Sequence, residues 1–150
     1  MSYEAKLKEL GYDVQPVDLN TGRFLHAVRT GNLIYTSGQV SAWDGVEIRG
    51  KLGQDLSLEE GYEAASMSAL NALAAVKTLA GSLDNVARVV KVLGMVNVGP
   101  DFNDTPSVIH GCSDLLLEVF GEAGRHARSA VGMTIPFDFA VEVEMIVEVK

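Results

Sequence analysis

The sequence has 150 residues, of which 47% are hydrophobic and 21% charged, and its formal net charge is -8 at pH 7. A chain of this size can bury one core without disulfide or metal staples, so we expect a single domain over residues 1–150. The acidic balance and the scattered Lys and Arg residues disfavour nucleic-acid binding, because phosphates would be repelled and no basic stripe is present to displace counterions.

The sequence shows no signal for membrane insertion, for secretion or for a structural metal site. The most apolar stretch, residues 64–80, is interrupted by polar side chains such as Asn71 and Lys77, and the N-terminus lacks the charged-then-apolar order of a secretory signal. The single cysteine, Cys112, can form neither an intramolecular disulfide nor a thiolate cluster for zinc. We therefore expect a cytoplasmic protein without a metal or cofactor.

The N-terminal segment, about residues 1–23, precedes the core. Ser2 is placed to cap a short helix through Leu10, with Gly11 as its stop, and the residues that follow have a loop composition. Two β-branched and aromatic runs, 24–30 and 33–40, are separated by Gly31-Asn32, a pair that favours a tight hairpin turn. The short run 46–49 predicts a third, minor strand or a bulged edge.

Two helices are predicted from their capping signals. Ser57 and Glu60 have capping-box spacing, which predicts a long helix from there to about Ala80. Thr105-Pro106 is expected to open a second helix, with the threonine as its cap. Between them, residues 89–98 read as a nearly continuous apolar strand. The buried face of the second helix is predicted from the apolar spacing of Ile109, Cys112, Leu116 and Phe120.

The last third of the chain predicts two strands, 127–133 and 139–149. The final strand alternates, so that its valines and Met145 face one way while Glu142, Glu144 and Glu148 face the other. The order of the elements favours an α+β fold, in which two helices cover one face of a mostly antiparallel sheet. The glutamate face is then left for water or another subunit to cover.

Arg128 is the strongest candidate for an anion-binding residue. If the last two strands pair as a hairpin, Glu142 and Glu144 lie opposite Arg128-Ser129, and Arg128 could present its planar fork to a carboxylate. The alternative for Arg128 is a structural ion pair with Glu142 or Glu144. His126 lies on the same side of the extended strand as Arg128, and its role is left open.

Other polar residues give weaker signals. Ser37-Gly38 interrupts an apolar strand, where a glycine allows a ligand or another backbone to approach closely, although a simple bulge explains it equally well. His26 and His110 show no metal-ligand spacing, and we expect structural or surface roles for them. Cys112 is expected to be a buried small hydrophobe, and no nucleophile elbow is present.

Three motifs together resemble the YjgF/RidA family, also called endoribonuclease L-PSP. They are Arg29-Thr30-Gly31-Asn32-Leu33-Ile34-Tyr35-Thr36-Ser37-Gly38-Gln39, Ala127-Arg128-Ser129-Ala130-Val131, and Val141-Glu142-Val143-Glu144. The resemblance extends from about Phe24 to the C-terminus. It implies a chorismate-mutase-like fold and a homotrimer with a ligand cleft at each subunit interface.

The resemblance also implies an activity and roles for individual residues. Relatives with deaminase activity hydrolyse 2-imino or 2-enamino acids to 2-oxo acids and ammonia. By motif matching, Arg128 would hold the substrate carboxylate, Glu142 would act on water, and Ser37, Gly38 and Phe24 would line the pocket; Glu144 is an alternative to Glu142. The chemistry is physically reasonable, because an imine carbon is already electrophilic.

This chain departs from the family pattern at three places. Phe24 stands where relatives often have tyrosine, Ala130 replaces a frequent cysteine, and the region 102–120 is longer than usual. These departures indicate a divergent branch. The competing function is a noncatalytic, regulatory trimer that binds a small carboxylate, and ribonuclease activity ranks last because of the acidic charge.

Overall fold

Six strands form the main sheet of the computed structural model, which describes all residues from 1 to 150. The strand order is β1, β2, β8, β6, β7, and the short strand β3 also pairs with β8. Only β6 and β7 run parallel; the other pairs are antiparallel. The strands span Ala27–Thr30 (β1), Leu33–Thr36 (β2), Gln39–Val40 (β3), Val86–Asn97 (β6), Ala127–Met133 (β7) and Val141–Val149 (β8).

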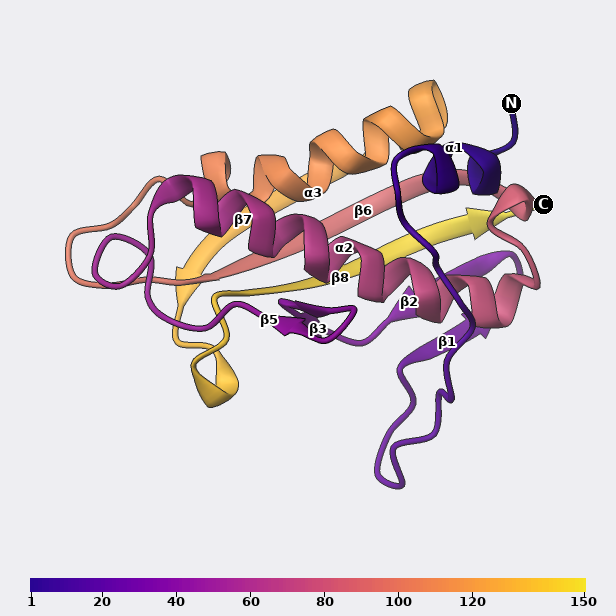
Figure 1. The fold of residues 1–150 in the computed structure, drawn as a ribbon. Coiled ribbons are helices and arrows are strands. Elements are labelled where there is room, and N and C mark those ends of the chain that lie inside the picture. The colour runs from indigo at the N-terminus through magenta and orange to yellow at the C-terminus, as the bar shows by residue number, and fades with distance from the viewer.

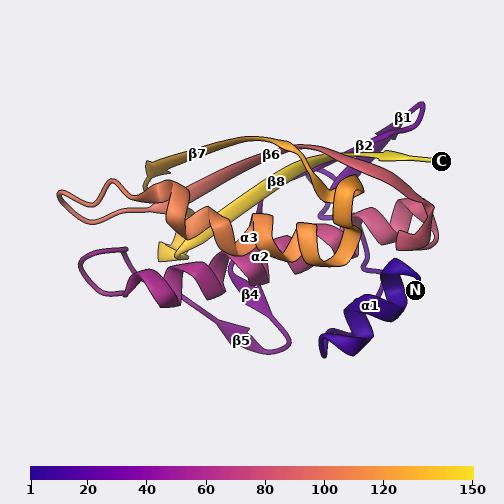
Figure 2. The same ribbon diagram turned by 90° about the horizontal axis from the view of Figure 1, so that it is seen from above.

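Helices cover one face of this sheet, and nothing covers the other (Figure 2). The two long helices α2 and α3 lie side by side on the covered face, with the short helix α1 at one end of the layer (Figure 1). None of the helices combines the length and apolarity needed to cross a bilayer. The helices span Tyr3–Glu9 (α1), Leu58–Ala80 (α2) and Thr105–Phe120 (α3), and three short 3-10 turns span Leu83–Asn85, Gly121–Gly124 and Pro136–Asp138. The predicted α+β fold, with two helices on one face of a mostly antiparallel sheet, is confirmed.

The core lies between the helices and the alternating side chains of the sheet. On β8, Val141, Val143 and Val147 are fully buried, whereas Glu142 and Glu144 lie on the uncovered face. Period-two alternation places every second side chain on the same face, and the valine face is the one that contacts α2. The predicted division of this strand into a core face and an acidic face is therefore confirmed.

The caps of the long helices follow their sequence signals, with one correction. Ser57 and Glu60 form the predicted capping box, and Gly81 ends α2 at a positive φ of 82°. The cap of α3 is Asp104, whose carboxylate accepts from the Ser107 amide; the prediction of Thr105 is wrong by one residue. Thr105 is buried instead, and its hydroxyl donates to the Ala130 carbonyl of β7.

The strands near the N-terminus are shorter than predicted. Phe24 to His26 lie outside β1, and the predicted strand 33–40 is broken at Ser37-Gly38 into β2 and β3. The break is stabilised locally, because the Ser37 amide donates to the His26 carbonyl at 2.8 Å. The predicted minor strand 46–49 does not join the main sheet; β5, Val46–Glu47, pairs only with β4, Ala42–Trp43.

The last two strands do not pair with each other, so the hairpin considered for them is absent. Strand β6 lies between β7 and β8, parallel to the first and antiparallel to the second. The helical connection α3 explains this order, since a crossover helix returns the chain to the same end of the sheet and makes β6 and β7 parallel. This topology decides which residues can share a site.

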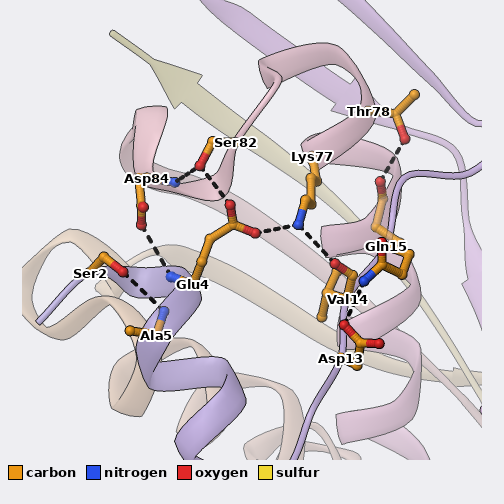
Figure 3. A network of polar contacts seen from close by, with 11 residues as sticks. Ser2, Glu4, Ala5, Asp13, Val14, Gln15, Lys77, Thr78, Ser82 and Asp84 are labelled. Carbon is orange, nitrogen blue, oxygen red and sulfur yellow. Dashed lines mark hydrogen bonds and ion pairs between the residues drawn. The ribbon is translucent and has the colours of Figure 1, made fainter.

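A polar network fastens α1 to the C-terminal end of α2 (Figure 3). The Glu4 carboxylate accepts hydrogen bonds from the Lys77 ammonium and from the Ser82 hydroxyl, and the Glu4 amide donates to Asp84. Burial raises the pKa of Glu4, but the hydrogen bonds from Lys77 and Ser82 outweigh it, and the net shift is downward. The N-terminal segment is thus attached to the core through specific contacts, far from the residues discussed next.

Candidate functional site

Arg128 lies on edge strand β7 and points to the helix-covered side of the sheet. Its register partner on β6 is Val92, which is fully buried beneath the helices. One terminal nitrogen, Nη1, donates to His110 Nδ1 at 3.0 Å and to Ser113 Oγ at 3.2 Å. Both partners come from α3, so the βαβ unit of β6, α3 and β7 positions the arginine.

Each hydrogen bond around Arg128 has a defined donor and acceptor. His126 Nδ1 lies 2.7 Å from the Gly124 carbonyl oxygen, which can only accept, so Nδ1 carries the proton. In neutral His126, Nε2 then accepts from the Ser113 hydroxyl at 2.9 Å, while Ser113 Oγ accepts from Arg128. Arg128 can only donate, so His110 Nδ1 is an acceptor and its proton lies on Nε2.

No carboxylate pairs with the Arg128 guanidinium within ion-pair distance. Its partners are neutral and occupy only Nη1, so the edge formed by Nε and Nη2 stays free. That edge has the geometry with which arginine binds a carboxylate through two hydrogen bonds. The structural ion pair with Glu142 or Glu144, considered from the sequence, does not form within the chain.

Arg128 opens onto a hollow of about 410 Å³ at the outer edge of the sheet. The one acidic side chain in its wall is Asp114, which accepts from the Tyr62 hydroxyl at 2.6 Å. This hydrogen bond, together with burial, raises the pKa of Tyr62 to about 12, so the tyrosine remains a donor. The hollow is lined by His110, Ser113, Asp114, Leu117, Arg125, His126 and Arg128.

Glu142 lies on the opposite, uncovered face of the sheet. Its register partner on β6 is Met95, which alternates with the β6 residues that face the helices and so lies on the uncovered face with Glu142. Burial, and next the charge of Glu144, raise the pKa of the Glu142 carboxyl. A carboxylate with a raised pKa is a better proton acceptor than an ordinary one, as a general base requires.

Gly38 makes room for the Glu142 carboxyl group. A Cβ added at Gly38 would come within 2.2 Å of Glu142 Oε2, closer than any real contact. The group next to this glycine is the Glu142 side chain, whereas the sequence suggested a ligand or another backbone. Neighbouring Ser37 donates its hydroxyl to the Leu25 carbonyl at 2.6 Å, so its oxygen keeps lone pairs for a further donor.

Phe24 lies in the loop before β1 and is 58% exposed. Its ring contacts the His26 imidazole edge to face, with 6.0 Å between the centroids. His26 Nδ1 in turn lies 3.3 Å from Gln39 Nε2, next to Ser37 and Gly38. The break between β2 and β3 is therefore surrounded by a second group of residues, namely Phe24, Ser37, Gly38 and Glu142.

Glu144 lies two residues after Glu142 on the same face of β8. It lines a hollow of about 270 Å³ on the uncovered face together with Lys91 and Ile146.

Cys112 is fully buried, and burial raises the pKa of its thiol to about 12, so it is not a nucleophile at neutral pH. No group of three or more potential metal ligands occurs in the chain.

The structure therefore divides the predicted site residues into two sets. Arg128 and His126 share the hollow behind β7, whereas Glu142, Ser37 and Gly38 share the opposite face. His110 is exposed, as expected for a surface or structural role, and its ring also contacts Arg128. Ser113, the second partner of Arg128, is not among the residues predicted from the sequence. His110 and Ser113 are three residues apart, which places both on one face of the predicted helix. The sequence does not show that this face lies beside β7.

The fold is that of a chorismate-mutase-like α+β protein. The model of the YjgF/chorismate mutase-like endoribonuclease family matches residues 4–148, and the chain belongs to this family. Protein TCP17 of Trypanosoma cruzi is 40% identical over 149 residues, which cover 97% of this chain and 93% of that protein.

Solved structures agree with this assignment. Atu1372 of Agrobacterium tumefaciens, a protein of unknown function, superimposes with a TM-score of 0.90 at 40% identity and covers 99% of this chain and 92% of its own. The Escherichia coli protein TdcF, solved with bound serine, has a TM-score of 0.63 at 22% identity, with 92% and 97% of the two chains covered. The lower identity of TdcF makes it a relative in fold.

Proposed function

We propose that this protein hydrolyses a small 2-imino or 2-enamino acid to a 2-oxo acid and ammonia, in sites formed between the subunits of a homotrimer. The observation that carries the proposal is the free guanidinium edge of Arg128, held by neutral partners in an open hollow. A half-buried arginine without a counterion is suited to a carboxylate that arrives with a ligand. The serine bound to TdcF supports a ligand of this class.

The reaction needs only one water and proton transfers. Water adds to the carbon of the protonated imine while Glu142 accepts a proton from the attacking oxygen, which forms a neutral carbinolamine. Glu142 returns that proton to nitrogen, and as the C–N bond breaks the carbinolamine hydroxyl gives its proton to the ionised Glu142, so that a carbonyl remains. Ammonia leaves and takes up this last proton from Glu142. The raised pKa of Glu142 favours these transfers, since the carboxylate accepts and then returns a proton readily.

Subunit assembly brings the two residue groups together in this proposal. Arg128 and Glu142 lie on opposite faces of the sheet, with β6 between their strands. A small substrate therefore cannot contact both residues of the same chain. The uncovered face carries exposed apolar side chains, among them Tyr35, Val131 and Met133, and β7 is a free edge. A ring of three chains can bury that face and bring β7 of one subunit to the Glu142 side of the next.

The test is ammonia release from freshly generated 2-imino acids, with and without the protein. We expect release above background for the wild-type protein and its loss in Arg128→Ala, with the fold retained, because Arg128 contributes no ion pair to the core. Unfolding of Arg128→Ala, seen by circular dichroism, would instead assign the residue a structural role.

The alternative is a trimer that binds a small carboxylate without turning it over. Serine in the TdcF structure is a bound amino acid and not an imine, which is the observation that favours this alternative. Both functions need Arg128, but only hydrolysis needs Glu142. Ligand binding by the wild-type protein without ammonia release from any of several imino acids would select the binding function.

A further inference from the structure

The hollow beside Arg128 is basic in a chain whose net charge is -8. Four basic side chains line it: His110, Arg125, His126 and Arg128. The only carboxylate in the wall, that of Asp114, is already engaged by the Tyr62 hydroxyl. Its fixed positive charges are Arg125 and Arg128, and each guanidinium can bind a carboxylate.

The hydrogen-bond directions leave several donors free toward a ligand. His110 uses Nδ1 as an acceptor for Arg128, so its N–H lies on Nε2, which has no partner in the chain. Arg128 keeps Nε and Nη2. His126, by contrast, uses both ring nitrogens in contacts to Gly124 and Ser113 and serves to hold the array.

Arg125 supplies the second fixed positive charge. It precedes Arg128 by three residues at the entrance to β7, so the two Cα atoms lie about 10 Å apart in extended chain. Its only ion pair, with Glu122 at 3.5 Å, is exposed and weak enough for a ligand to displace. Two long side chains that line one hollow of about 410 Å³ can contact two anionic groups on one small molecule.

We propose that this hollow selects 2-imino acids whose side chain carries a second carboxylate, the carbon skeletons of acidic amino acids. Arg128 binds the carboxylate next to the imine, and Arg125, assisted by the His110 N–H, binds the distal one. This inference rests on the proposed function for the reaction, but the ligand class can be tested without turnover. The products are the corresponding 2-oxo diacid and ammonia.

Calorimetric titration of the assembled protein with 2-oxoglutarate and with 2-oxopentanoate tests the inference. These five-carbon 2-oxo acids differ in that only the first has a distal carboxylate. We expect the diacid to bind about tenfold more tightly, as a charge-assisted contact to a second arginine provides. Arg125→Gln should remove this preference, and Arg128→Ala should weaken both ligands.

Lys6→Gln is the matched control, because Lys6 also forms an i,i+3 ion pair and its loss changes the net charge equally. It should leave the preference intact. Equal affinity for the two acids in the wild-type protein, or an unchanged preference in Arg125→Gln, would overturn the inference. Selective diacid binding combined with no ammonia release from imino diacids would retain the ligand class and reject the proposed catalysis.

Discussion

At the scale of single residues, Gly38 is what allows the Glu142 carboxyl to occupy its position. Its backbone does not require a positive φ, so alanine fits the chain there, but the added Cβ would lie 2.2 Å from Glu142 Oε2. Since the clash is with the end of a flexible side chain, Gly38→Ala should move the carboxyl group without unfolding the protein. We predict a loss in kcat on the order of a hundredfold, measured as ammonia release.

A double-variant cycle provides the control for this prediction. Gly38→Ala should cost no further activity in a Glu142→Gln background, because both changes disable the same carboxyl group. Independent, additive losses would mean that Gly38 acts through the backbone or through substrate contact instead.

The raised pKa of Glu142 predicts how both the activity and the stability of the protein depend on pH. As a general base it must be ionised, so activity should rise with pH and reach half its plateau above the ordinary carboxyl value of 4.5. For stability the sign is opposite: a carboxyl whose pKa is raised in the folded state favours folding below its unfolded pKa, and this contribution is lost as pH rises through the folded pKa.

Glu142→Gln should therefore raise the thermal midpoint at neutral pH and leave it unchanged at a pH well below 4.5, while abolishing the pH-dependent rise in rate. Paired thermal scans and rate profiles would check both signs. A lower midpoint for the variant at neutral pH would show that the ionised carboxylate makes a stabilising contact.

At the scale of elements, the contact between α2 and α3 depends on Gly111. A Cβ at this position would lie 1.9 Å from the Tyr62 carbonyl oxygen, a backbone atom that cannot rotate away. Alanine normally favours a helix interior by about 1 kcal/mol relative to glycine. Here we predict that Gly111→Ala instead destabilises the fold by about 3 kcal/mol, measured by urea denaturation, because the two helices must separate.

The elements themselves were largely predictable because their signals are local. The capping box at Ser57 and the alternation of β8 each lie within one segment, and both were confirmed. Pairing of β7 with β6 was not predictable in the same way, since it depends on how α3 returns across the sheet. For the same reason Arg128 was recognised from its motif, whereas its contacts to His110 and Ser113 were not.

At the scale of the whole molecule, the separation of Arg128 and Glu142 on opposite faces yields a test of the assembly. In the proposed ring, each site takes Arg128 from one subunit and Glu142 from its neighbour. Arg128→Ala and Glu142→Gln are each expected to be inactive alone. When the two variants are co-expressed in equal amounts, a site is intact wherever a Glu142→Gln subunit donates Arg128 to an Arg128→Ala neighbour.

Random mixing in a closed ring predicts that about a quarter of the sites are intact, so the mixture should recover about a quarter of wild-type ammonia release. Separately expressed variants, mixed only in the assay, are the control and should stay inactive until subunits exchange. Sedimentation should show the same trimer for every sample. No recovery in co-assembled trimers would place both residues in sites within single chains, and a monomer at micromolar concentration would remove the interface site altogether.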